Sequence, residues 1–129
     1  MAGGRAAVTS FLNVDLDICG DARDIEEFLK PIEASVIVLR RIGKDASMEL
    51  AETYPSLEQT ILSWIDFVGT FSPDAKDIWD RLTLRSLNVG ILAASEPYSA
   101  SFPISAKAVA LTATLGFEIV FTVYAPRAD

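Results

Sequence analysis

The stretch FLNVDLDI, residues 11–18, alternates apolar and polar side chains. Successive side chains of a β-strand point to opposite faces of a sheet, so this period of two is typical of a strand with one buried face. We expect the strand to begin near Val8 and to belong to a sheet whose other face is open to solvent. The alternation assigns Leu12, Val14, Leu16 and Ile18 to the buried face, and Asn13, Asp15 and Asp17 to the open face.

Helices are expected where apolar residues recur three and four positions apart after a capping residue. The first covers residues 20–33, with Asp21 or Asp24 as its N-cap and with Pro31 disturbing its last turn. The others are expected to begin at serine N-caps, and Gly116 is expected to end the last of them. These serines are Ser56, Ser72 and Ser105.

Further strands are expected over 35–42, 46–52, 83–95 and 117–126. The first two form a hairpin around a short turn, and the basic residues near that turn would protect its outer edge. Segment 108–125 carries only one charge, Glu118, but Gly116 divides it into a helical half and a β-branched half, so we expect helix and strand instead of a membrane span. In the closing strand the inward side chains would be Phe117, Ile119, Phe121 and Val123.

The order of these elements predicts an α+β fold, a two-layer sandwich in which a mixed, mainly antiparallel sheet carries helices on one face. The order begins with the ferredoxin-like βαββαβ pattern and is extended by one αβ unit. We expect residues 1–129 to form a single domain, with residues 1–7 as a flexible leader. The loop over 95–103 leaves open a short edge strand between Tyr98 and Phe102.

The composition narrows the classes of function. The chain has 18 acidic and 11 basic residues, a formal net charge of −7 and no histidine. This charge repels nucleic acid and anionic membrane surfaces, so we expect neither as a partner. Without histidine, Ser-His-Asp and Cys-His catalysis and nearly all zinc sites are excluded. The lone cysteine, Cys19, cannot form an internal disulfide and fits a reducing cytoplasm, where we expect the protein to act.

Three segments are similar to a group of small, uncharacterised bacterial α/β proteins, a domain of unknown function. These segments are LNVDLDI at 12–18, IWDRLTLRSLNVGI at 78–91 and LGFEIVFTVYAP at 115–126. The resemblance covers under half of the chain but is spread along its length. It implies a sandwich fold and a binding protein, in the manner of immunity or accessory proteins of bacterial toxin systems, more than an enzyme. It implies no catalytic residues and no cofactor.

The polar face of strand 8–18 is the first candidate site. Asp15 and Asp17 would lie about 7 Å apart on it, because each strand residue rises about 3.3 Å. With Asn13 they could offer oxygen ligands to Mg²⁺ or Ca²⁺, and their spacing also suits a general acid/base pair. Since no calcium-loop spacing accompanies them, we predict no metal site here, and since no aromatic platform accompanies them either, we predict no catalytic residue. We interpret the face as solvated surface that is available to a partner.

Two other segments are candidates for partner binding. In helix 73–82, Asp74 and Asp77 flank Trp79, which is either the anchor of an acidic recognition helix or a core residue beside solvated acids. In the loop that follows strand 83–95, Glu96 and Tyr98 have the polar and aromatic character that suits binding.

Two functions therefore remain open. The first is a non-enzymatic, immunity-like protein whose acidic surface binds a partner protein, which we expect to be basic. The second is a small-ligand or cation-binding module on the open sheet face. A homodimer formed through the sheet is a further expectation. The sequence identifies neither the partner nor the ligand.

Overall fold

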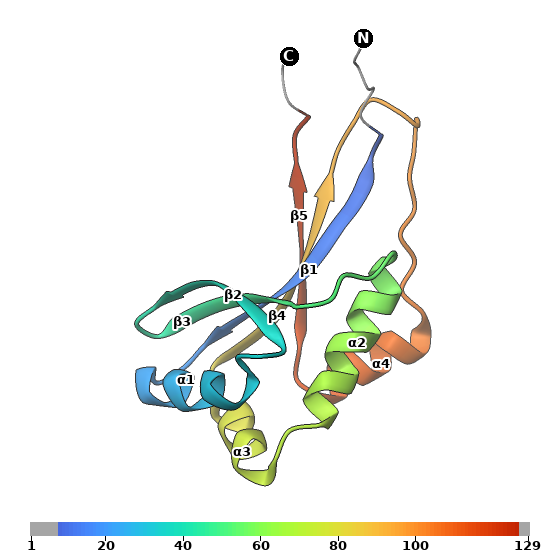
Figure 1. The fold of residues 1–129 in the computed structure, drawn as a ribbon. Helices are drawn as coiled ribbons and strands as arrows, with labels where there is room; N and C mark the ends of the chain where they lie inside the picture. Colours follow the sequence, from blue (N-terminus) through green and yellow to red (C-terminus); the bar gives the residue numbers. More distant parts are fainter. Residues whose placement is uncertain (1–7, 127–129) are drawn as a thin grey trace.

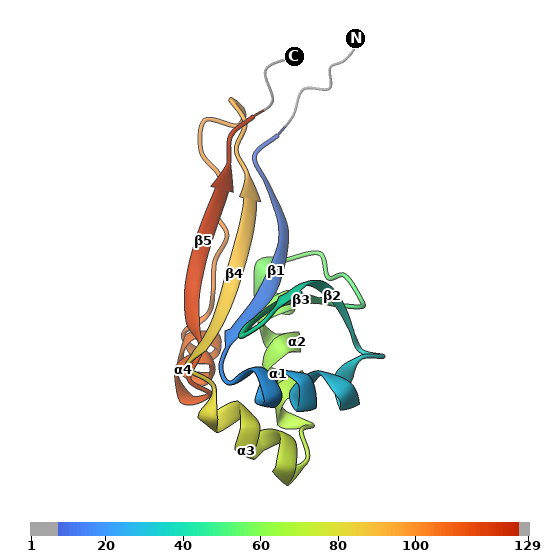
Figure 2. The same cartoon turned by 90° about the vertical axis from the view of Figure 1, so that its left-hand side faces the viewer.

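The computed structural model describes residues 8–126 and contains one five-stranded sheet with helices packed against one of its faces (Figures 1 and 2). The order across the sheet is β2-β3-β1-β4-β5. The strands are β1 (Ser10–Cys19), β2 (Val36–Ile42), β3 (Asp45–Leu50), β4 (Leu84–Leu92) and β5 (Glu118–Tyr124). The helices are α1 (Ala22–Leu29), α2 (Leu57–Gly69), α3 (Pro73–Arg81) and α4 (Ala106–Thr114).

The sheet is mixed and mainly antiparallel, as predicted. The central strand β1 pairs antiparallel with both β3 and β4, and β2 pairs antiparallel with β3. This arrangement is the split βαβ order expected of the ferredoxin-like pattern. The added αβ unit places β5 parallel to β4 at the outer side of the sheet. The predicted α+β sandwich is therefore confirmed.

The core lies between the helices and the inner face of the sheet. Val14, Leu16 and Ile18 of β1 are buried there, as the alternation predicted. Both tryptophans are also buried, and the indole of Trp64 donates a hydrogen bond to the Val14 carbonyl at 3.0 Å. The indole of Trp79 donates to the Leu115 carbonyl at 3.1 Å, so Trp79 is a core residue and not an exposed anchor.

The predicted helix starts are confirmed, because each is set by a local hydrogen bond. Asp21 accepts hydrogen bonds from two backbone N–H groups at the start of α1. Ser56, Ser72 and Ser105 each accept one from the backbone N–H three residues later. The first helix is shorter than predicted, since the chain tightens into a 3₁₀ turn over Lys30–Ile32, at Pro31.

The alternation of strand β1 fails at one position. The pairing of β1 with β4 shifts between Phe11 and Asn13, which leaves Leu12 as the extra residue of a β-bulge. Leu12 is consequently exposed, and the partly buried Phe11 packs against the core in its place. The predicted burial of Leu12 is therefore wrong. The register after the bulge keeps Asn13, Asp15 and Asp17 on the open face.

The prediction for the closing strand is half correct. Phe117 is buried and Ile119 is partly buried, but Phe121 and Val123 are 52% and 60% exposed. The reason is that β1, β4 and β5 extend beyond the layer of helices, so the far end of β5 has little above it (Figure 1). The possible edge strand between Tyr98 and Phe102 does not form; this part of the chain is irregular.

Candidate functional site

The strand register gathers polar side chains on the open face of the sheet, opposite the helices. Asp15 of β1 lies opposite Asn88 of β4, and Asp17 lies between Ser86 of β4 and Ser47 of β3. Since β1 is the central strand, its carboxylates are flanked by polar residues on both sides. Asp15 and Asp17 therefore lie on one open face, as predicted, and Asn88 lies on the same face.

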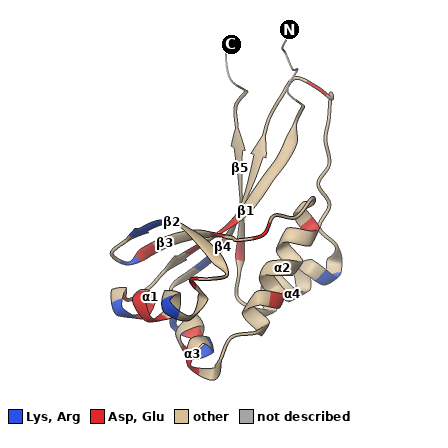
Figure 3. Ribbon diagram, viewed as in Figure 1, with Lys and Arg blue, Asp and Glu red and all other residues tan. Residues whose placement is uncertain are grey.

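The open face is strongly acidic. The same alternation places Asp45 and Glu49 of β3 and Glu118 of β5 on it. Among the strand residues described, register assigns one basic residue to this face, Arg40 of β2, which donates a hydrogen bond to Ser47. Figure 3 shows acidic positions on β1, β3 and β5, and basic positions on the β2–β3 hairpin and near the start of β4.

Hydrogen bonds hold the polar side chains of this face in place. The Asn13 amide donates to Glu49 Oε2 at 3.0 Å, which ties β1 to β3. The Thr122 hydroxyl donates to Asn88 Oδ1 at 2.7 Å, and the Asn88 amide lies 3.5 Å from Asp17 Oδ2. Within residues 8–126, no side chain donates a hydrogen bond to the Asp15 carboxylate, and neither ion pair of this part of the chain includes it.

Asp15 is the carboxyl group most affected by this environment. Partial burial, the nearby charge of Glu49 and the charge of Asp17 together raise the pKa of Asp15 to about 6. All three effects disfavour the carboxylate, and no cation offsets them among the described neighbours. We call Asp15, Asp17 and Glu49 the acidic patch. Its geometry favours a group that brings positive charge and hydrogen-bond donors.

A shallow hollow of about 210 Å³ is lined by two members of the acidic patch, Asp15 and Glu49. Leu12, exposed by the β-bulge, and Tyr124 at the end of β5 supply an apolar rim. The hollow is thus rich in acceptors at its floor and apolar at its edge, which suits the stem and head of a lysine or arginine side chain. Its lining is Leu12, Asn13, Asp15, Glu49, Asn88, Gly90 and Tyr124.

The other predicted site residues lie far from the acidic patch in the fold. Asp74 and Asp77 are exposed on α3, which packs on the opposite side of the sheet (Figures 1 and 2). Glu96 and Tyr98 lie in the loop after β4, near the outer ends of β1 and β5, and Tyr98 is fully exposed. The structure therefore unites Asn13, Asp15 and Asp17 but leaves these four in separate places.

Glu49 is a site residue that sequence reasoning missed. The signal for it was present, because Ser47 and Glu49 alternate with buried Ala46 and Met48 in the second strand of the predicted hairpin. The alternation does not show that this strand pairs with β1. This pairing brings Glu49 beside Asn13 and Asp15.

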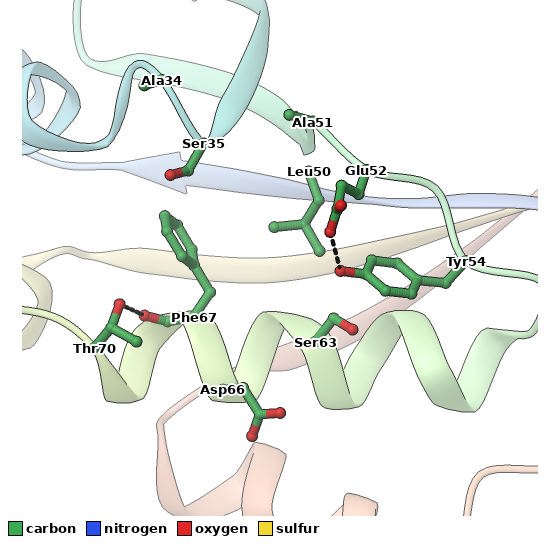
Figure 4. Close-up of a pocket in the computed structure, with 10 residues that line it drawn as sticks. All are labelled: Ala34, Ser35, Leu50, Ala51, Glu52, Tyr54, Ser63, Asp66, Phe67 and Thr70. Atoms are coloured by element: carbon green, nitrogen blue, oxygen red, sulfur yellow. Dashed lines mark hydrogen bonds between the residues drawn. The ribbon is translucent and has the colours of Figure 1, made fainter.

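A second cavity of about 350 Å³ lies between α2 and the end of the β2–β3 hairpin. Leu50 and Phe67 form its apolar floor, while the Tyr54 hydroxyl donates to Glu52 at its rim (Figure 4). Six of its ten lining residues are polar, including the carboxylates Glu52 and Asp66, and Glu52 already accepts the hydrogen bond from Tyr54. A third hollow, of about 450 Å³, lies at the start of α2 beside Phe11 and Phe102. The third hollow is lined by one carboxylate, Glu58.

Cys19 lies at the end of β1, where its thiol donates a hydrogen bond to Asp45 at 2.9 Å. This hydrogen bond, followed by desolvation and nearby acidic charge, raises the pKa of Cys19 to about 11. The nucleophilic thiolate is therefore scarce at neutral pH.

Within residues 8–126, no group of three or more histidine, cysteine or acidic side chains has the arrangement needed to hold a metal ion. None of the helices in this part of the chain is long and apolar enough to cross a membrane. Comparisons of the chain with models of protein families, with curated proteins and with solved structures gave no match.

Proposed function

We propose that this protein is a non-enzymatic, immunity-like binding protein that receives a basic partner protein on its open sheet face. The observation that carries the proposal is the acidic patch, in which Asp15 and Glu49 line a hollow of about 210 Å³, Asp17 lies beside them on β1, and no described cation pairs with them. In this proposal an arginine or lysine of the partner enters the hollow beside Asp15.

A basic side chain in the hollow would interact favourably with the charge of Asp15. The charged form of Asp15 is disfavoured by partial burial and by its acidic neighbours, and the attraction of a cation placed in the hollow would oppose both effects. A hydrogen bond between a guanidinium or ammonium group and a carboxylate contributes about 1.5–3 kcal/mol. The apolar rim of Leu12 and Tyr124 adds contact with the stem of the same side chain.

The whole molecule supports the same kind of partner. The net charge of −7 attracts a basic protein over a long range and speeds its encounter with the acidic face. The resemblance of segments 12–18, 78–91 and 115–126 to small bacterial proteins of immunity-like character points in the same direction. The lone thiol Cys19 fits action in a reducing cytoplasm.

The proposal is tested with a defined probe, an oligo-arginine peptide, added to the isotopically labelled protein. We expect amide NMR signals of β1, β3 and β4 near the acidic patch to shift as the peptide binds. In the double variant Asp15→Asn, Asp17→Asn the affinity should fall about tenfold, a loss of about 1.4 kcal/mol. An oligo-glutamate peptide of equal length should cause no shift.

The matched control is the double variant Asp74→Asn, Asp77→Asn, which removes the same charge from α3. It should bind the peptide nearly as well as the unmodified protein, because long-range attraction alone changes equally in both variants. Equal losses in the two double variants, or shifts centred on α3, would show that the peptide follows net charge and would contradict a site on the open face.

A further inference from the structure

The outer side of β5 is a free sheet edge. β5 covers seven residues, Glu118–Tyr124, and pairs along its whole length with β4 on one side. On its other side no strand of residues 8–126 pairs with it. Figure 2 shows β5 at one side of the sheet and the β2–β3 hairpin at the other. Backbone N–H and C=O groups on such an edge are available to a further strand.

The two edges of the sheet differ in how they are protected. β2 is interrupted by a bulge between Val38 and Arg40, and it carries Arg40 and Arg41. Bulges and basic side chains are devices by which natural edge strands avoid pairing with other chains. β5 has a regular register and one charged residue, Glu118, at its first position. Its remaining length is uncharged in Figure 3.

The side chains of β5 are unusually exposed and apolar for a solvated edge. Phe121 and Tyr124 are each 52% exposed and Val123 is 60% exposed. Phe121 and Val123 lie where β5 extends past the helices, and Tyr124 lies on the open face, so no helix of the described chain covers them (Figure 1). An apolar strand with a free edge is the arrangement that favours pairing with another strand.

The direction of the free backbone groups can be derived from one hydrogen bond. The Ala93 N–H donates to the Tyr124 carbonyl at 2.8 Å, so Tyr124 directs its backbone groups toward β4. Backbone groups alternate in direction along a strand. The residues that direct their N–H and C=O away from β4, toward the free edge, are therefore Ile119, Phe121 and Val123.

We propose that a second copy of this chain pairs with this edge, β5 against β5 in antiparallel register, about a two-fold axis at Phe121. This register pairs the whole strand with itself. Phe121 lies opposite Phe121 of the second copy and exchanges two hydrogen bonds with it, and Ile119 lies opposite Val123 and does the same. Every outward backbone group of the strand centre then has a partner.

The occupant is a second copy because the strand is self-complementary. Phe121 opposite Phe121 forms an aromatic cross-strand pair, and Val120 faces Thr122. Glu118 lies opposite Tyr124, so no charges of equal sign face each other. The two Glu118 residues are separated by roughly 20 Å along the ladder, beyond the Debye length at physiological salt. The two-fold axis leaves both acidic patches exposed, on the same side of a continuous sheet.

Self-association is measured by sedimentation velocity from low to high micromolar protein. We expect reversible dimers that strengthen as salt rises, since screening reduces repulsion between two chains of charge −7 each. Binding of the oligo-arginine peptide should weaken under the same change. A protein that stays monomeric over this range, or forms only species larger than a dimer, would contradict the proposal.

Charge substitutions at the axis test the register. Phe121→Lys alone and Phe121→Glu alone should each weaken the dimer about tenfold or more, because like charges then face each other. An equal mixture of the two variants should form the mixed dimer. The control Leu39→Lys adds the same charge at a similarly exposed site on β2 and should remain dimeric. Loss of dimer in the control, or no recovery in the mixture, would overturn the β5 register.

Amide hydrogen exchange gives an independent readout in the unmodified protein. The outward amides of Ile119, Phe121 and Val123 should exchange slowly at high protein concentration and fast at low concentration. The inward amides of Val120 and Thr122, bonded to β4, should exchange slowly at both concentrations. Concentration-independent exchange of the outward amides would contradict the pairing. The variant Asp15→Asn, Asp17→Asn should still dimerise, so failure of one proposal does not imply failure of the other.

Discussion

Asp15 is the residue of the open face whose charged form is disfavoured by its surroundings. Its pKa is raised to about 6 by partial burial and by Glu49 and Asp17. A carboxyl group with a higher pKa in the folded chain than in the unfolded chain holds more protons when folded. The free energy of unfolding therefore falls as pH rises from about 4 to about 6, and the loss is complete above this window.

This leads to a prediction for Asp15→Asn, which removes the charge but keeps the shape. At about pH 8 the variant should be more stable than the unmodified protein, by about 1 kcal/mol after allowing for solvent screening of a half-buried group. Below about pH 3 the gain should vanish, because Asp15 is then neutral in both states. Urea unfolding at both pH values measures the difference. Asp74→Asn, at an exposed site, should change stability by less than about 0.5 kcal/mol at either pH.

At the residue scale, alternation alone predicted much of the site. Asn13, Asp15 and Asp17 lie on one open face because side-chain direction in a strand is a local property. The exposure of Leu12 could not be predicted, since the bulge depends on how β1 pairs with β4. The contribution of Glu49 likewise depends on the pairing of β1 with β3, which no local pattern encodes.

At the element scale, helix starts were predictable and strand surroundings were not. Each serine cap forms its hydrogen bond within four residues of the chain, so the local sequence is enough to predict it. The inward prediction for Phe121 and Val123 failed for the opposite reason. Their exposure depends on where the helices end relative to the sheet, which is a property of the packed molecule.

The cap of α2 yields a second prediction. The Ser56 hydroxyl accepts a hydrogen bond from the Gln59 N–H at 3.1 Å and donates one to the Gln59 side chain at 3.0 Å. Ser56→Ala should therefore cost about 1 kcal/mol of stability. Ser63→Ala, in the middle of the same helix, removes only a hydrogen bond to the Gln59 carbonyl and should cost clearly less. Similar losses of stability for the two variants in urea unfolding would show that the cap stabilises the protein no more than the mid-helix hydrogen bond of Ser63 does.

At the scale of the whole molecule, the sheet offers two separate surfaces. Its open face carries the acidic patch in the middle, while its β5 edge is apolar and almost uncharged. The helices occupy the other face and contribute to neither surface (Figure 2). The two-layer architecture was predictable because the order of elements restricts how helices can return to one sheet. Which surface acts, and on what partner, requires the three-dimensional arrangement.

The most direct test of the central proposal is affinity capture from the lysate of the native host, washed at low and high salt. Three baits are compared: the unmodified protein, Asp15→Asn with Asp17→Asn, and Asp74→Asn with Asp77→Asn. We predict that a basic protein is retained at low salt by the first and third baits and lost from the second, and that high salt weakens its retention. Equal retention by all three baits, or loss from the α3 variant alone, would contradict binding at the acidic patch.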